Sequence, residues 1–223
     1  KELFIAIISE NQEFIGSIPL VERPWHLEES GNYVFVGVRQ AGKSYLLYQR
    51  VKELLGCGIN LHDIVYVNFD DERLLGMTTD DFDLILQAYY SMHGGQPIFF
   101  FDEIQNVDGW ANFARRLANQ KHRVYVTGSN AKMLSRDIET VLGGRYLSVY
   151  VFTYSFEEYL KAIGISVSGG SQYGRKANEL QRHFRTYFEW GGFFELVNFR
   201  VKRVCLNSLY SRIFFHDLLV RHK

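Results

Sequence analysis

Cysteine and proline are scarce in this chain. Its 223 residues include two cysteines, Cys57 and Cys205, and three prolines. The cysteines lie far apart and form no C-x-x-C pair, so no disulfide framework is predicted and two free thiols in a reducing cytoplasm are expected. The chain also lacks the run of about 18 apolar residues that a membrane span requires. It has no signal-peptide pattern either, so we expect a cytoplasmic protein without a membrane partner.

A net charge is absent as well. The chain carries 25 Lys and Arg against 25 Asp and Glu, which gives a formal charge of +0. No overall field therefore draws it to nucleic acid or to an acidic surface, although a local basic patch is still compatible with this balance. The chain starts with Lys1 rather than Met, so we expect either a fragment or a chain whose start is missing. Its length suits one sizeable domain with a small second one.

Short apolar segments separated by helical stretches dominate the first two thirds of the chain. They predict five strands, at Tyr33–Val36, Ile64–Phe69, Ile98–Phe101, Arg123–Thr127 and Tyr146–Val151. Strands that alternate with helices are typical of an α/β fold with a parallel sheet covered on both faces. A helix over Lys1–Phe14 and an irregular lead-in to Ser30 precede them. After Val151 the pattern is helical, with a capping box at Ser155 and Glu158 and a last helix predicted over Asn207–Leu219.

The stretch Gly37–Ser44 fits the phosphate-binding pattern G-x-x-x-x-G-K-[ST] in full. It follows a predicted strand and opens a predicted helix, so its backbone N–H groups and the helix N-terminus can surround a polyphosphate. Lys43 is expected to reach the β- and γ-phosphates of ATP, and the Ser44 hydroxyl to bind Mg²⁺. The predicted nucleotide-binding residues are Gly37, Arg39, Gln40, Ala41, Gly42, Lys43, Ser44 and Tyr45. Arg39 has an equally good alternative as a surface or structural ion-pair partner.

Two carboxylates follow a buried strand and complete the predicted nucleotide site. Asp102 and Glu103 come directly after Ile98–Phe101, at the end of the strand where parallel sheets bind ligands. Asp102 would hold the Mg²⁺ water shell, and Glu103 would take a proton from the attacking water as general base. The acidic segment Asp70–Glu72 lies at the same sheet edge. We favour a solvated turn there over an extension of the Mg²⁺ shell.

Small polar residues and two arginines are further candidates. Ser129 and Asn130 follow the fourth predicted strand and could contact the γ-phosphate or the attacking water, although Asn130 serves equally well as a helix cap. Arg136 and Arg145 lie between the fourth and fifth strands. An arginine there suits neutralisation of a transferred phosphoryl group, often across a subunit boundary, and Arg145 is the first choice. The alternative for both is an ordinary surface arginine.

These motifs resemble those of the AAA-type P-loop ATPases of the ASCE division. The resemblance rests on G-V-R-Q-A-G-K-S, F-F-F-D-E-I-Q and V-T-G-S-N-A. It is closer to a large group of uncharacterised prokaryotic ATPases, in which an ATPase domain precedes a C-terminal domain of unknown function. Leu142–Arg145 with Phe152–Leu160, and Tyr187–Glu195, are similar to two later motifs of that group. Thr153 and Phe194 depart from it, since the group usually has proline at both places.

The resemblance implies a P-loop NTPase fold with five parallel strands in the order 5-1-4-3-2. It implies an ATPase domain over residues 1–152 and a helical, winged-helix-like region over 153–223, as the start of a truncated C-terminal part. It also implies that the protein works as a homo-oligomer or as a switch. The C-terminal part would then contact DNA or a protein partner.

Three functions fit these residues. The first is an ATP-hydrolysing enzyme that couples nucleotide state to conformational change, which the second carboxylate, Glu103, favours. The second is a low-turnover, nucleotide-dependent switch or binding module that acts on DNA or a protein. The third is a small-molecule kinase, which is disfavoured because no arginine-rich lid is evident. The guanine-reading N-K-x-D pattern is also absent, which favours adenine.

Overall fold

The computed structural model describes residues 1–128, 140–166 and 174–213. Contacts divide the chain into two compact units. The first contains residues 1–37 and 43–150, and the second contains residues 38–42 and 151–223. Each unit is described by itself below. Among the described residues, no helix is both long and apolar enough to cross a membrane.

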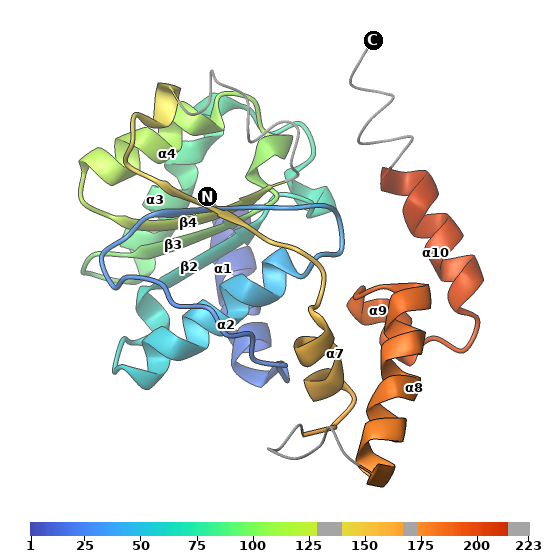
Figure 1. The fold of residues 1–223 in the computed structure, drawn as a ribbon. Helices are drawn as coiled ribbons and strands as arrows, with labels where there is room; N and C mark the ends of the chain where they lie inside the picture. The colour runs from blue at the N-terminus through green and yellow to red at the C-terminus, as the bar shows by residue number, and fades with distance from the viewer. Residues whose placement is uncertain (129–139, 167–173, 214–223) are drawn as a thin grey trace. The chain divides into compact units, whose positions relative to one another are not determined.

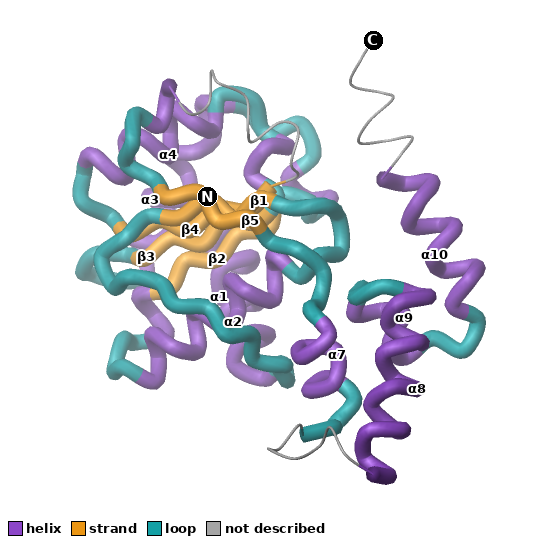
Figure 2. The backbone as a smooth tube through the Cα atoms, in the orientation of Figure 1, coloured by secondary structure: helices purple, strands orange, loops and turns teal. Residues whose placement is uncertain are grey.

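A five-stranded parallel sheet forms the centre of the first unit, with helices on both sides (Figures 1 and 2). The strand order is β2-β3-β4-β1-β5, which confirms the predicted order 5-1-4-3-2. The strands are β1 (Tyr33–Val36), β2 (Ile64–Asn68), β3 (Ile98–Asp102), β4 (Arg123–Gly128) and β5 (Leu147–Tyr150). All five predicted strands are present, with ends that differ by at most one residue. Since every neighbour is parallel, the carboxyl ends of the strands meet at one edge.

The two faces of the sheet carry different side chains. One face packs Val and Phe, such as Val67 and Phe101, into a core shared with three helices. These are α1 (Glu2–Ser17), α3 (Phe82–Met92) and α4 (Trp110–Asn119). The strand residues on the other face include a row of stacked aromatic rings. The ring centroid of Tyr125 lies 5.9 Å from that of Tyr33 and 4.7 Å from that of Phe100. The guanidinium of Arg50, on α2 (Lys43–Gly56), lies over the Tyr125 ring.

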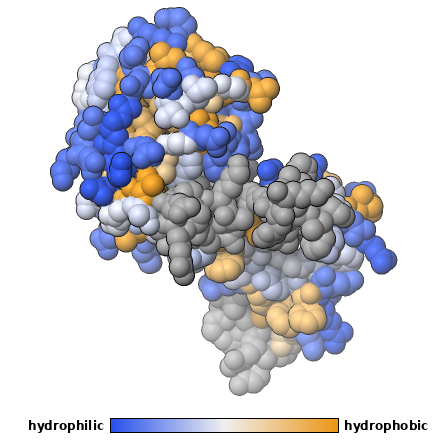
Figure 3. All heavy atoms as spheres, turned by 90° about the horizontal axis from the view of Figure 1, so that it is seen from above, coloured by the Kyte–Doolittle hydropathy of each residue, from blue (hydrophilic) through white to orange (hydrophobic). Residues whose placement is uncertain are grey.

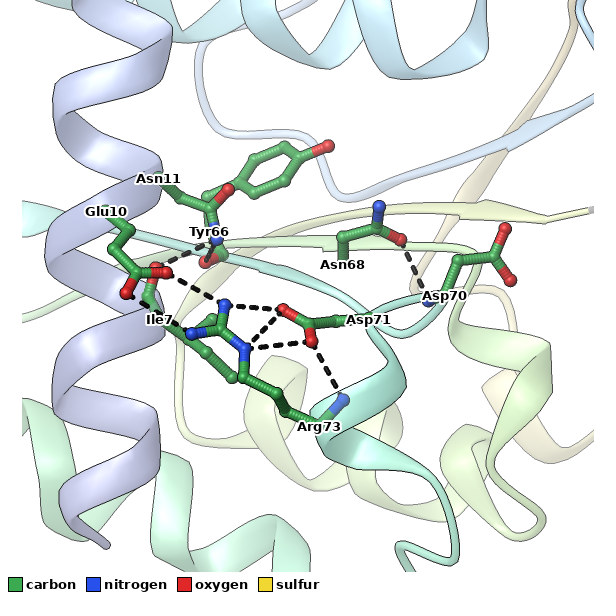
Figure 4. Close-up of polar contacts among 8 residues, drawn as sticks. All are labelled: Ile7, Glu10, Asn11, Tyr66, Asn68, Asp70, Asp71 and Arg73. Atoms are coloured by element: carbon green, nitrogen blue, oxygen red, sulfur yellow. Dashed lines mark hydrogen bonds and ion pairs between the residues drawn. The ribbon is translucent and has the colours of Figure 1, made fainter.

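Helix α1 covers the free edge of β2. An edge strand presents unpaired carbonyls, and two side chains of α1 bind them. Gln12 Nε2 donates to the Ile64 carbonyl at 2.8 Å, and Asn11 Nδ2 donates to the Tyr66 carbonyl at 3.4 Å (Figure 4). The helix extends to Ser17, three residues beyond the predicted end at Phe14, because Ile15 is also fully buried.

The described part of the second unit is helical. It contains α7 (Phe156–Ala162), α8 (Gly174–Trp190), α9 (Phe194–Asn198) and α10 (Lys202–Ser211). The predicted capping box is confirmed, since Ser155 Oγ accepts from the Glu158 N–H and Glu158 Oε2 accepts from the Ser155 N–H. The predicted start of the last helix at Asn207 is wrong, because the helix already begins at Lys202. Residues 214–219 of that prediction lie outside the described residues.

Aromatic packing joins α7 to α8. The Phe156 ring lies 5.2 Å from Phe184 and 5.5 Å from Tyr187, and Tyr159 is also 5.5 Å from Tyr187. The Tyr187 hydroxyl donates to the Tyr154 carbonyl at 2.8 Å. The helical spacing of these aromatic residues is therefore explained by packing within the unit.

Candidate nucleotide site

The phosphate-binding pattern forms the connection from β1 to α2. Gly37 and Lys43–Ser44 belong to the first unit, whereas contacts assign Val38–Gly42 to the second. Gly42 has a φ of 92° and Gln40 a φ of 60°, so the chain turns through left-handed conformations just before the helix begins. Glycine adopts such angles without steric cost, which explains why the pattern requires it before the lysine. Helix α2 begins at Lys43, so its N-terminal dipole end lies at the loop.

Lys43 is buried at the sheet edge with only 4% of its surface exposed. Its Nζ donates to the Gly37 carbonyl at 3.2 Å and lies 3.3 Å from Glu103 Oε1. A lysine in this position carries the one ammonium that the pattern places next to a polyphosphate. The contact with Glu103 brings together the two motifs that the sequence places 60 positions apart.

Asp102 ends β3 and is 1% exposed. Its Oδ2 accepts a hydrogen bond from the Tyr66 hydroxyl at 2.7 Å, and its Oδ1 accepts one from Thr127 Oγ1. The Ser44 hydroxyl also hydrogen-bonds to this carboxylate. Burial raises the pKa of Asp102 above its ordinary value, and the three hydroxyl contacts act in the opposite direction.

Glu103 follows with a left-handed backbone, at φ 51° and ψ 39°. Such angles are uncommon for a residue with a side chain and cluster at functional sites. Its N–H donates to Thr127 Oγ1 at 2.9 Å, which fixes the turn against β4. Its Oε2 accepts from Gln105 Nε2 at 2.6 Å, so each carboxylate oxygen has a partner.

The donor set of Ser44 and Asp102 fits a magnesium ion. Both supply oxygen atoms, which Mg²⁺ prefers, and their mutual hydrogen bond places them beside one another. Mg²⁺ usually keeps several waters and uses only one or two protein ligands together with substrate phosphates. A hydroxyl and a carboxylate next to a phosphate-binding loop match that requirement.

A profile of the AAA domain family matches residues 30–160, more than half of the chain. The chain belongs to the AAA-type P-loop ATPase family.

Two relatives of this AAA domain are uncharacterised proteins. One, MJ1544 of Methanocaldococcus jannaschii, is 33% identical over 230 residues, covering 100% of this chain and 50% of the relative. The other, from Haemophilus influenzae, is 30% identical over 192 residues, covering 84% of this chain and 46% of the relative. The chain therefore spans about half the length of both relatives.

Solved structures resemble the AAA domain more distantly. A closed-state reconstruction of Hsp104 with ATPγS and FITC casein has a TM-score of 0.48 at 10% identity, covering 91% of this chain and 37% of that one. Saccharomyces cerevisiae RIF2 has a TM-score of 0.44 at 14% identity, covering 89% of this chain and 84% of that one. At these values neither supports an argument about function.

The remaining predicted residues of the AAA domain differ in their placement. Tyr45 is 43% exposed on the first turn of α2, with its ring edge-on to Tyr48, and Arg39 is exposed in the loop. Ser129, Asn130 and Arg136 lie outside the described residues.

Arg145 lies at the amino-terminal ends of the strands, opposite the carboxyl ends where the nucleotide site lies. It precedes β5, whose first residue, Leu147, pairs with Tyr33 at the start of β1. A strand of four residues spans about 13 Å, so Arg145 is separated from its own nucleotide site by the depth of the sheet. Its Nε donates to Asn119 Oδ1 at 2.6 Å. Any contact of Arg145 with a nucleotide must therefore be made in a second copy of the domain.

The acidic segment after β2 is held by other side chains. Arg73 bridges Asp71 and Glu10, at 2.7 Å and 2.8 Å from the nearest oxygens (Figure 4). Asp70 accepts a hydrogen bond from Asn106 Nδ2 at 2.5 Å. Arg73 holds the pKa of Asp71 below its ordinary value. The segment is therefore a partly exposed turn that links β2 to α1, as favoured above over an extension of the Mg²⁺ shell.

Sequence reasoning missed four side chains around the carboxylates, namely Tyr48, Tyr66, Gln105 and Thr127. The sequence places Thr127 in a strand without a role at the site, although a polar residue that ends a fully buried apolar run is itself a signal. Tyr66 carried a similar signal, because a tyrosine in a doubly covered strand needs a partner for its hydroxyl. Nothing in the linear sequence identifies that partner as Asp102, since the contact depends on the register of β2 and β3.

Proposed function

We propose that this AAA domain binds ATP with Mg²⁺ and hydrolyses it, and that nucleotide state is coupled to a conformational change. One observation carries the proposal: Lys43, Ser44, Asp102 and Glu103 meet at the carboxyl edge of the sheet. The Lys43 ammonium would bind the β- and γ-phosphates. The Ser44 hydroxyl and the Asp102 carboxylate would hold Mg²⁺ and its water shell, and the ion would neutralise charge on the phosphates.

Glu103 is the proposed general base. Its carboxylate would orient a water for in-line attack on the γ-phosphate and take the proton at Oε1 or Oε2. Both oxygens have one partner in this structure, Lys43 and Gln105, and an ionised carboxylate has about four acceptor positions, so each oxygen can still accept the proton. The two contacts would hold the carboxylate in place.

The ion pair of Glu103 with Lys43 favours the second candidate function, a low-turnover switch. If Glu103 stays paired with Lys43 and does not orient a water, nucleotide would stay bound for long periods and its state would be read by a partner. Steady-state hydrolysis by the full-length protein, with and without DNA, compared with the affinity for Mg-ATP, distinguishes the two. Turnover well below 1 per minute with tight binding supports the switch, and faster turnover supports the enzyme.

A partner for the second unit is also proposed. Large apolar side chains on α8 and α10 are exposed, with Phe188 at 82%, Val204 at 67% and Tyr210 at 61%. In the view of Figure 3, hydrophobic residues lie at the surface among hydrophilic ones. Exposed apolar side chains are typical of a surface that binds another protein. A surface that binds the DNA phosphate backbone carries lysine and arginine instead. Homo-oligomerisation is part of the proposal, with Arg145 as the residue that would contact the nucleotide of a second copy.

A further inference from the structure

We propose that Tyr66 is a positioning residue for magnesium, because its hydroxyl orients the carboxylate of Asp102. The inference deepens the proposed function and rests on it. Tyr66 lies on β2, an element that contributes no residue to the phosphate-binding or acidic motif. It would act through Asp102 and not by touching the nucleotide.

The contact is short and buried. The Tyr66 hydroxyl donates to Asp102 Oδ2 at 2.7 Å, and the two residues are each 1% exposed. Water cannot replace this bond without entering the core. A buried polar group without a partner is destabilising, so the hydroxyl and the carboxylate are strongly held together.

Three hydroxyls surround this one carboxylate. Ser44 comes from α2, Tyr66 from β2 and Thr127 from β4. An ionised carboxylate has about four acceptor positions, so three hydroxyl donors leave about one for a water of the Mg²⁺ shell. The orientation of Asp102 is then determined by its neighbours before the metal binds. Such outer partners fix the ligands they contact and tune metal affinity.

Tyr66 is itself fixed at two points. Its carbonyl accepts from Asn11 of α1 (Figure 4), and its ring packs against Tyr48 of α2 at 5.3 Å between centroids. The Tyr48 hydroxyl also acts electrostatically on the Tyr66 hydroxyl. The chain of contacts runs from α2 through β2 to β3.

A purely structural role is the competing explanation. A buried tyrosine needs a partner for its hydroxyl whether or not a metal binds nearby. The two explanations differ in one measurable quantity, the gain in nucleotide affinity that Mg²⁺ produces. Loss of packing alone would weaken binding equally with and without the metal.

The test compares Tyr66→Phe with the wild type and with a matched control. Tyr89→Phe removes another buried hydroxyl, one that lies 3.3 Å from Asp63 Oδ1 just before β2 begins, at the edge opposite the nucleotide site. The affinity for the slowly hydrolysed analogue ATPγS is measured in EDTA and then in excess Mg²⁺. Tyr66→Phe should keep the EDTA affinity within about 2-fold and lose about 10-fold of the Mg²⁺-dependent gain. Tyr89→Phe should keep both.

A double-mutant cycle tests whether Tyr66 acts through Asp102. In an Asp102→Asn background, Tyr66→Phe should cause no further loss of the Mg²⁺ response. If Tyr66→Phe does not fold, as judged by circular dichroism, Tyr48→Phe decides the question. It removes the outer hydroxyl and should lose about 3-fold of the gain, as a weaker outer-partner effect. A wild-type response of Tyr48→Phe would then overturn the proposal.

The remaining outcomes distinguish a failure of the role of Tyr66 from a failure of the proposed function. A Tyr66→Phe protein that gains affinity from Mg²⁺ as the wild type does overturns the role of Tyr66 and leaves the proposed function intact. The same holds if Tyr66→Phe weakens binding equally in EDTA and in Mg²⁺. A wild type that binds no ATPγS under either condition overturns the proposed function, and this inference with it.

Discussion

Lys43, which is buried, and Glu103, which is partly buried, form an ion pair with 3.3 Å between Nζ and Oε1 and side chains that are 3% and 16% exposed. The pair joins the phosphate-binding loop to the end of β3. Breaking a buried pair by removing one partner leaves the other charge uncompensated, so substitutions on the two sides are not equivalent. The first two predictions address the two partners of this pair separately.

Lys43→Ala should abolish tight binding of Mg-ATP. It removes the ammonium that is expected to reach the β- and γ-phosphates and leaves the backbone of the loop as a weak cradle. Titration calorimetry measures the effect. Lys52→Ala is the control, because Lys52 lies on the same helix but binds the Ile18 carbonyl, and it should keep wild-type affinity. Unchanged affinity of Lys43→Ala would refute the assignment of this loop.

Glu103→Gln should keep ATP bound and reduce hydrolysis by at least about 100-fold. The amide preserves the shape of the side chain and its hydrogen bond with Gln105, but it cannot accept a proton from water. The assay is phosphate release under saturating Mg-ATP. Glu72→Gln, an exposed acidic residue after β2, is the control and should hydrolyse at the wild-type rate. Rapid turnover of Glu103→Gln would mean that another residue is the base.

Arg145→Ala should reduce hydrolysis by about 100-fold and change nucleotide affinity little, because the contact is made in the transition state. The position of Arg145, away from the nucleotide site of its own copy, means that an arginine contact would be made with the nucleotide of a second copy. Wild-type specific activity should therefore rise with protein concentration. A mixture of Arg145→Ala and Glu103→Gln should hydrolyse ATP faster than either variant alone, since Glu103→Gln supplies the arginine and Arg145→Ala supplies the base. Wild-type turnover of Arg145→Ala alone, with a specific activity that does not depend on protein concentration, would leave Arg145 as a structural residue.

Strands β1 to β4 could be predicted from the sequence because each is a nearly continuous apolar run that is almost entirely buried, whereas β5, at the lateral edge of the sheet, has mostly exposed side chains. Ile98–Phe101 is the clearest case, since no residue of β3 is exposed. The two carboxylates after it could be placed at the ligand-binding edge for the same reason. The strand order came from the family resemblance, because apolar runs alone do not specify which strands are neighbours.

The surroundings of Asp102 could not be predicted in this way. Tyr66 and Thr127 reach it from two neighbouring strands, and such contacts depend on register and side-chain direction. The position of Arg145 shows the same limit. Its place between two strands in the sequence suggested a site residue, whereas the parallel pairing of β5 with β1 places it at the opposite edge.

Lys121→Gly should raise the free energy of unfolding by about 1 kcal/mol. Lys121 follows α4 with a left-handed φ of 66°. Its N–H donates to the Ala118 carbonyl, and the His122 N–H donates to Leu117, which is the hydrogen-bond pattern of a helix end that favours glycine. A left-handed conformation costs a side-chain residue about 1–2 kcal/mol, part of which the greater freedom of glycine in the unfolded chain offsets. Urea denaturation measures the change, and a lower midpoint would contradict it.

Gly192→Ala should destabilise the second unit by about 1–3 kcal/mol, the usual cost of a forced overpacking. A Cβ at this position would lie 2.0 Å from the Tyr154 carbonyl oxygen, and the two backbones are already joined by a hydrogen bond from the Tyr154 N–H to the Gly192 carbonyl at 2.8 Å. The obstacle is backbone, so no side-chain rotation relieves it. Gly164→Ala is the matched control for added bulk, because nothing lies within 4 Å of its Cβ, although its φ of 77° carries its own strain. Hydrogen exchange should show faster opening of α7 and α8 in Gly192→Ala, while β1 to β4 keep wild-type protection. Equal protection of α7 and α8 in Gly192→Ala and the wild type would mean that Tyr154 can move away without cost.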